Sequence, residues 1–180
     1  MDQALEPLIE MHSWIWKRFK RTLVDLEPDE VDWRPLPQAN NINTIVRHLR
    51  IEAEWHVDCL ERGVAMPAAD VTSEVQQWID SVPMDFDGNL GKLEELYSRF
   101  IAQLSALAHD ALKQQSTLAY KEFPSTVPAH MLGFHQAVHL SGHLAQISTI
   151  RNLYRKTRGE RALFFPDNPT YPKQAAVPIE

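Results

Sequence analysis

The sequence predicts an all-α fold, a four-helix bundle with long proline-marked connections. Apolar residues recur at steps of three and four along four segments, each roughly 20 to 29 residues long, which is the period of an amphipathic helix. The two long connections between them are polar and contain Pro28, Pro35, Pro37, Pro67 and Pro83. No segment alternates apolar and polar residues for long enough to indicate a sheet.

The first two helices are expected over residues 3–25 and from about 41 to 62. In the first, leucine, isoleucine and aromatic residues repeat along one face. The second follows Asn40 and Asn41, either of which can cap a helix N-terminus, and Gly63 is a natural stop after Arg62. The apolar residues of this second helix are Ile42, Ile45, Val46, Leu49, Ala53 and Leu60.

The third and fourth helices are expected over residues 89–114 and from 126–128 to about 154. Pro128 suits the first turn of the fourth helix, where its missing N–H costs nothing. A short helix is also expected at residues 74–80, inside the proline-marked connection 64–88, while residues 26–39 form the other long connection. Four amphipathic helices must bury their apolar faces against each other, and a bundle is the simplest way to do so.

Length and composition indicate one globular domain over residues 1–160, followed by an extended C-terminal tail, 161–180, packed on the bundle. A chain of 180 residues can bury a core without disulfides. Cys59 is the single cysteine and is expected to be a buried thiol. The N-terminus lacks the basic and apolar regions of a signal peptide, so a cytoplasmic location is expected.

Charge and motifs argue against several function classes. The formal net charge is −6, which disfavours nucleic acid as a partner. No apolar run approaches the length of a membrane-spanning helix, and there is no phosphate-binding glycine loop and no HExxH motif. One basic cluster lies near the end of the fourth expected helix, where cations complement the helix dipole. Its members are Arg151, Arg155, Lys156, Arg158 and Arg161.

The placement of the eight histidines indicates a metal site. His139 and His143 are four residues apart on the fourth expected helix, so their imidazoles lie one turn apart on nearly the same face. His48 lies beside the apolar face of the second expected helix and is placed to face the bundle interior. Imidazoles from two such faces can bind one cation.

Spacing alone leaves alternatives for this site. His135 extends the series on the fourth helix, so His135 and His139 form a rival pair. His56 lies about 80° around the helix from His48 and is expected to face solvent or the far end of the bundle. His12 is expected in the core of the first helix, and His109 and His130 look exposed.

Three short motifs resemble the DinB/YfiT-like four-helix metalloproteins over most of residues 1–155. In that family the three metal ligands fall on His48, His139 and His143. Ala145 departs from the family pattern, which usually has glycine there. The motifs are Trp33-Arg34-Pro35, Asn41-Ile42-(x)3-Val46-Arg47-His48-Leu49 with Glu52 after it, and His139-(x)3-His143-Leu144-Ala145-Gln146-Ile147 followed by Arg151.

The resemblance implies a homodimer that binds one divalent ion, zinc, nickel or iron, at an open end of the bundle. Characterised relatives transfer bacillithiol, mycothiol or glutathione, or are mycothiol-dependent isomerases. We therefore expect a metal-dependent transferase with a small thiol cosubstrate and an electrophile, or a related hydrolase. Glu52 is the candidate catalytic proton acceptor, and Gln146 a candidate for orienting a ligand.

Two further interpretations stay open on the sequence. The first is a non-catalytic metal-binding or stress-response module, in which the ion stabilises the helices. The second is a plain helical interaction domain whose histidines are core residues. A charged Glu52 on a helix that also carries Arg47 and Arg50 can also be an ordinary surface residue.

Overall fold

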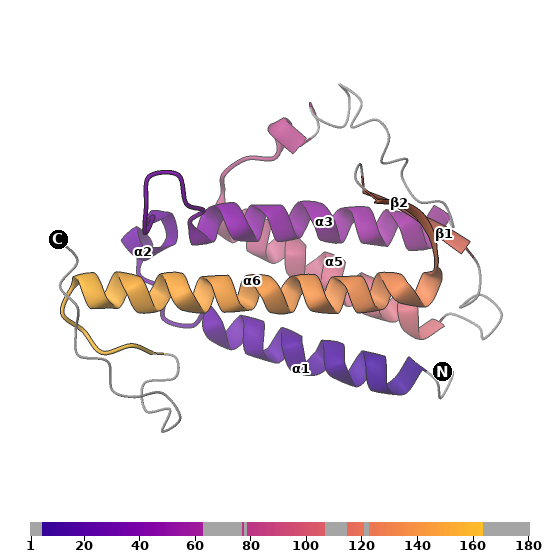
Figure 1. The fold of residues 1–180 in the computed structure, drawn as a ribbon, viewed down its shortest axis with the longest axis horizontal. Coiled ribbons are helices and arrows are strands. Elements are labelled where there is room, and N and C mark those ends of the chain that lie inside the picture. Colours follow the sequence, from indigo (N-terminus) through magenta and orange to yellow (C-terminus); the bar gives the residue numbers. More distant parts are fainter. Residues whose placement is uncertain (1–4, 63–76, 78, 107–114, 121–122, 164–180) are drawn as a thin grey trace.

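The structure is a computed structural model, and it describes residues 5–62, 77, 79–106, 115–120 and 123–163. Four long helices lie side by side and confirm the predicted four-helix bundle (Figure 1). They are α1 (Glu6–Thr22), α3 (Ile42–Arg62), α5 (Phe86–Ala106) and α6 (Ala129–Thr157). No helix in the described part of the chain is long and apolar enough to cross a membrane.

Two smaller elements were not predicted. A five-residue helix, α2 (Pro28–Asp32), interrupts the first connection. The strands β1 (Gln115–Tyr120) and β2 (Phe123–Pro128) form an antiparallel hairpin. The sequence did not indicate this sheet, because QSTLAY and FPSTVP do not alternate apolar and polar residues, which is the pattern that predicts a strand.

The hairpin also corrects the start of the last helix. Residues 126–128, expected to open that helix, belong to β2, and α6 begins at Ala129. The third expected helix starts three residues early, at Phe86, and its expected end, 107–114, lies outside the described residues. Of the short helix expected at 74–80, residues 77, 79 and 80 are helical, and the others lie outside the described residues. The same holds for tail residues 164–180.

The core forms where α3 packs on α5 and α6, and α1 packs on α6. Burying a large apolar side chain stabilises the fold by about 1.5–3 kcal/mol. The largest fully buried side chains come from all four long helices. They are Phe19, Ile42, Ile45, Leu49, Leu93, Leu96, Phe100, Leu104, Leu132, Leu140 and Ile147, with His12 among them.

The direction of α3 and α6 sets up the candidate site. The backbone N–H of Thr44 donates to Oδ1 of Asn41 at 2.7 Å, so Asn41 caps α3 and places His48 in its second turn. The helix runs toward the hairpin end of the bundle, where α6 begins (Figure 1). These two helices are therefore antiparallel neighbours.

The opposite end of α6 is tied to the connection after α1. Arg151 is 2% exposed and donates to Glu30 at 2.8 Å and to the carbonyl oxygens of Thr22 and Val24. A buried charge is tolerated when it is paired and hydrogen-bonded in this way. In the same basic cluster, Arg155 pairs with Glu160, and Arg158 also forms ion pairs. These cations therefore serve the fold at the helix end.

Candidate metal centre

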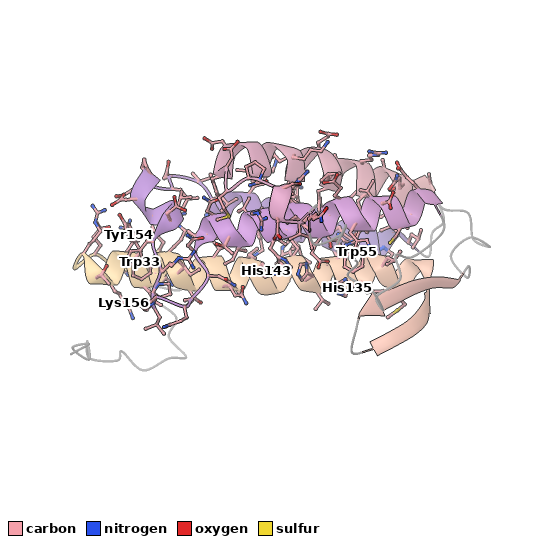
Figure 2. The ribbon with its side chains drawn as sticks, turned by 90° about the horizontal axis from the view of Figure 1, so that it is seen from above. Trp33, Trp55, His135, His143, Tyr154 and Lys156 are labelled. Atoms are coloured by element: carbon pink, nitrogen blue, oxygen red, sulfur yellow. The ribbon has the colours of Figure 1, made fainter. Side chains whose placement is uncertain are left out.

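Two rows of polar side chains, each called a ladder below, face each other between α3 and α6. On α3 the ladder is His48, Glu52 and His56, and on α6 it is His143, His139 and His135. A step of four residues keeps each ladder on one side of its helix. Figure 2 shows His135 and His143 along the edge of α6 that faces α3.

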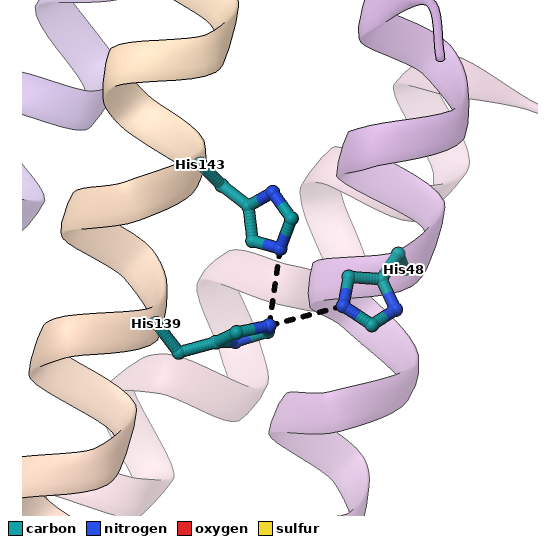
Figure 3. Close-up of side chains that lie close together, drawn as sticks. All are labelled: His48, His139 and His143. Carbon is teal, nitrogen blue, oxygen red and sulfur yellow. Dashed lines mark hydrogen bonds between the residues drawn. The ribbon is translucent and has the colours of Figure 1, made fainter. Parts of the chain in front are cut away.

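The first expected site residues, His48, His139 and His143, come together across this seam (Figure 3). Nε2 of His48 lies 3.0 Å from Nε2 of His139, and Nε2 of His143 lies 3.0 Å from the same atom. Each residue offers one ligand nitrogen, and all three nitrogens lie within 4.8 Å of one another. Tetrahedral zinc with bonds of 2.0–2.1 Å would set such nitrogens about 3.3 Å apart.

The positions of the protons on the three imidazole rings show that these residues fit a cation. Nδ1–H of His143 donates to Oε1 of Gln146 at 2.8 Å, so Nε2 of the neutral ring carries a lone pair. That lone pair and Nε2 of His48 both point at Nε2 of His139. One N–H cannot satisfy both contacts well, whereas a shared cation would accept all three lone pairs. Gln146, the candidate for orienting a ligand, contacts His143 on its own helix.

The three rings are in the protonation state that binds metal. Burial, together with the neighbouring imidazole of His143, lowers the pKa of His48 to about 4. Burial and the neighbouring imidazoles lower the pKa of His139 to about 3, and burial lowers the pKa of His143. All three imidazoles are therefore neutral at pH 7, although each keeps part of its surface open to solvent.

Glu52 follows His48 by one turn and is not a surface charge. Its side chain is 13% exposed, and Oε2 is buried with no hydrogen-bond partner among the described residues. Burial raises the pKa of this carboxyl to about 7. A carboxyl with such a pKa can accept and release a proton near neutral pH.

His56 and His135 form a second pair of histidines, in which both ring nitrogens of His56 have hydrogen-bond partners and the His135 ring stacks on that of His139 at a centroid distance of 5.8 Å. His56 is 4% exposed, so the expectation that it faces solvent or the far end of the bundle is wrong. Phe100 of α5 covers one side of its ring at a centroid distance of 6.1 Å. Its Nδ1–H donates to the carbonyl oxygen of Glu52 at 2.6 Å, and its Nε2 accepts from Nδ1–H of His135 at 3.0 Å.

His12 is a core residue, as expected. It is fully buried, its Nε2–H donates to the carbonyl oxygen of Gly133 at 2.9 Å, and its Nδ1 accepts from the hydroxyl of Tyr97 at 2.6 Å. The side chains of His109 and His130 lie outside the described part of the structure.

Two other side chains complete the surroundings of the seam. Cys59 is buried, as expected, and packs against Leu132. Gln136 is 1% exposed on α6, and its Oε1 has no partner among the described residues. Sequence reasoning missed Gln136, although its position three residues before His139 mirrors that of Gln146 three residues after His143.

Comparisons with known proteins give one family and one fold. A sequence model of the mycothiol-S-transferase family matches residues 9–156. YfiT from Bacillus subtilis, described as "a probable metal-dependent hydrolase with an unusual four-helix bundle topology", superposes with a TM-score of 0.62 at 16% identity, covering 89% of this chain and 90% of YfiT. A conserved protein from Enterococcus faecalis gives 0.63 at 15% identity, covering 85% and 98%.

No curated protein matches the chain. The two solved structures establish the fold alone at these identities, whereas the family match covers most of the bundle and includes both motif helices. The chain belongs to the mycothiol-S-transferase family of DinB/YfiT-like proteins.

Proposed function

We propose that this protein is a metal-dependent S-transferase that joins a small thiol to an electrophile. In this proposal His48, His139 and His143 bind one divalent ion. The observation that carries it is that Nε2 of His48 and Nε2 of His143 each lie 3.0 Å from Nε2 of His139, with the tautomer of His143 fixed by Gln146. The family match supports a thiol as cosubstrate, and the published description of YfiT supports a metal.

The number and type of ligands suit catalysis. Three protein ligands leave a further coordination position, as in catalytic rather than structural zinc sites, and a divalent ion there lowers the pKa of a thiol or water. Zinc, nickel and iron(II) all suit three imidazoles. The choice among them depends on supply in the cell.

Glu52 is the proposed proton acceptor. The thiol proton passes to its carboxylate, the sulfur forms a bond to carbon, and the bond from that carbon to the leaving group breaks. The leaving group takes the electron pair, and the proton then returns from Glu52 to solvent. The buried, unpartnered Oε2 and the pKa of about 7 support this role.

The helix that carries two ligands indicates an uncharged electrophile. Residues 129–150 of α6 contain no Asp, Glu, Lys or Arg, unlike the three other long helices. On one flank of His139 lies Leu140, fully buried, and on the other lies Val138, which is 70% exposed. The flank of α6 beside His139 that carries Val138 is therefore open to solvent, and a charged substrate approaching there would find no counter-ion on this part of α6.

Two alternatives use the same residues. With water in place of the thiol the protein would be a hydrolase. With no bound substrate it would be a non-catalytic metal-binding module whose ion stabilises the bundle. Residues 1–160 would be the metal-binding domain in either case, and we propose a homodimer, which sedimentation measurements would test.

The test uses protein purified without a metal-binding tag and loaded with zinc, nickel or iron(II). Mycothiol, bacillithiol and glutathione are each combined with monobromobimane, and conjugation is followed by fluorescence. We expect turnover with at least one thiol, loss on chelation and recovery on reloading. Glu52→Gln should retain the ion and lose most of kcat.

Each alternative gives a distinct outcome. Ester or amide cleavage without thiol transfer would establish the hydrolase. A bound ion whose removal lowers the melting temperature, with no activity toward either class of substrate, would establish the non-catalytic module.

A further inference from the structure

Two buried polar atoms on α6 have no hydrogen-bond partner among the described residues. They are Nδ1 of His139 and Oε1 of Gln136. Gln136 is 1% exposed, so water from the surface does not satisfy its carbonyl oxygen. Leaving a buried polar atom without a partner costs about 1–3 kcal/mol, and such atoms are rare in folded proteins.

These two atoms belong to residues three apart on one helix. Residues at this separation are neighbours on a helix surface. The same helix already contains one such pair, because Nδ1 of His143 contacts Oε1 of Gln146 at 2.8 Å, also three residues apart. Helix α6 thus has a glutamine three residues before its first candidate ligand and another three residues after its second.

The chemistry of the two unpaired atoms is complementary. When Nε2 of His139 faces a cation, the proton of the neutral ring must lie on Nδ1. Among the described residues, Nδ1–H is then a donor without an acceptor, and Oε1 of Gln136 is an acceptor without a donor. Side chains three residues apart on a helix are close enough for a direct hydrogen bond between such groups.

We propose that Gln136 accepts a hydrogen bond from Nδ1–H of His139 in the metal-loaded protein and is a positioning residue for that ligand. This inference rests on the proposed metal centre. Gln136 does not touch the ion or the substrate. It fixes the orientation and tautomer of the His139 ring, and partners of this kind are usually worth about 10- to 100-fold in metal affinity.

A positioning role and a structural role predict opposite results for Gln136→Met. Methionine is similar in volume and apolar, and it removes the acceptor. In the metal-free protein it removes an unpartnered buried oxygen, so the urea midpoint should stay the same or rise. In the loaded protein His139 loses its partner, so zinc affinity should fall. A glutamine that only supports the fold would give a lower midpoint and an unchanged affinity.

The experiment measures the zinc dissociation constant by competition with a chromophoric chelator and unfolding of the metal-free protein in urea. We expect Gln136→Met to raise the zinc Kd by about 10- to 100-fold and Gln136→Glu, which keeps an acceptor, to leave it near the wild-type value. Gln146→Met is the matched positive control. Gln103→Met is the negative control, because Oε1 of Gln103 is also buried with no hydrogen-bond partner in the part of the chain that the structure describes, but Gln103 lies on α5.

A direct readout is the imidazole region of the 1H–15N NMR spectrum of the zinc-loaded protein. The Nδ1–H of His139 should exchange slowly in wild type and in Gln136→Glu, and should exchange fast in Gln136→Met. An unchanged zinc Kd and unchanged exchange in Gln136→Met would overturn the inference and leave the metal centre standing. A wild-type protein that binds no ion would overturn both.

Discussion

Two groups of histidines lie in the same bundle and differ in how their ring nitrogens are satisfied. His12 has a partner on both nitrogens, and His56 has partners on both, one of them on His135. In the candidate triad, Nε2 of His139 faces the Nε2 atoms of both His48 and His143, and one N–H cannot satisfy both contacts. Nδ1 of His139 has no hydrogen-bond partner among the described residues. Burial and lowered pKa values are common to both groups. Incomplete hydrogen bonding, rather than burial, is therefore what marks a candidate ligand.

The largest expected effect comes from exchanging one histidine in each group. His139→Ala should weaken zinc binding by at least about 1,000-fold, or on the order of 4 kcal/mol, because it removes the nitrogen on which both contacts converge. His135→Ala, four residues earlier on the same helix, should retain one ion per chain. Elemental analysis and chelator competition measure both. Equal losses in the two variants would remove the distinction between the groups.

Acid should destabilise the metal-free protein through its buried histidines, and His12, which is not a candidate ligand, is the residue with which to test this. Burial lowers the pKa of His12 from 6.5 in the unfolded chain to about 4, so the unfolded state binds a proton first as the pH falls. The stability due to the neutral ring is complete above about pH 6.5 and is lost progressively toward pH 4, on the order of 3 kcal/mol for a fully buried ring. The pKa of His56 is lowered to about 4 in the same sense.

Urea unfolding of metal-free protein at pH 7, 5.5 and 4.5 measures this slope. His12→Phe should reduce it by the contribution of one titrating group. A slope that is the same in wild type and variant would contradict the assignment to His12.

His12→Phe should itself cost about 2 kcal/mol at pH 7, because it leaves Gly133 and Tyr97 without their buried partner. The ion content should not change, since both ring nitrogens of His12 already have hydrogen-bond partners and His12 is not a candidate ligand. Urea unfolding and elemental analysis of the same sample test the two halves of this prediction. Trp14→Phe, at a side chain 58% exposed on the same helix, is the control and should change stability by less than about 0.5 kcal/mol.

The smallest expected effect concerns substrate charge. Val138→Glu should lower kcat/KM for neutral monobromobimane relative to its trimethylammonium analogue by about tenfold, or about 1.4 kcal/mol, because it places a carboxylate on the uncharged flank of α6. Val138→Gln, of similar size and no charge, should behave as wild type. Val24→Glu, an identical change at a residue 55% exposed after α1, should leave the ratio unaltered.

Analytical ultracentrifugation of the same variants measures their oligomeric state. If Val138→Glu changes the oligomeric state and leaves the ratio of the two substrates untouched, the flank is a contact between copies of the chain.

Much of the scaffold follows from local sequence rules. The four long helices have clear periods, and Asn41 caps α3 where the sequence placed a cap. The hairpin was missed because neither QSTLAY nor FPSTVP alternates apolar and polar residues, and such alternation is the signal that predicts a half-buried strand. The burial of His56 was missed because it depends on α5 covering that side of α3, which the sequence of α3 does not encode.

The sequence was enough to list the candidate ligands, but the spacing of the histidines could not show which pair on the last helix belongs to the site. Spacing treats His135/His139 and His139/His143 alike, since both pairs are four residues apart. The two pairs differ in whether they lie opposite His48, and this depends on the axial register of the antiparallel helices α3 and α6. The raised pKa of Glu52 and the unpaired Oε1 of Gln136 likewise arise from packing.

X-ray absorption spectroscopy of the tag-free, zinc-loaded protein tests the central claim most directly. We predict one ion per chain with three imidazole nitrogens at about 2.0–2.1 Å and a further light-atom ligand, and a loss of this signal in His139→Ala. A chain that takes up no stoichiometric ion, or an imidazole shell that survives His139→Ala and disappears in His135→Ala, would contradict it.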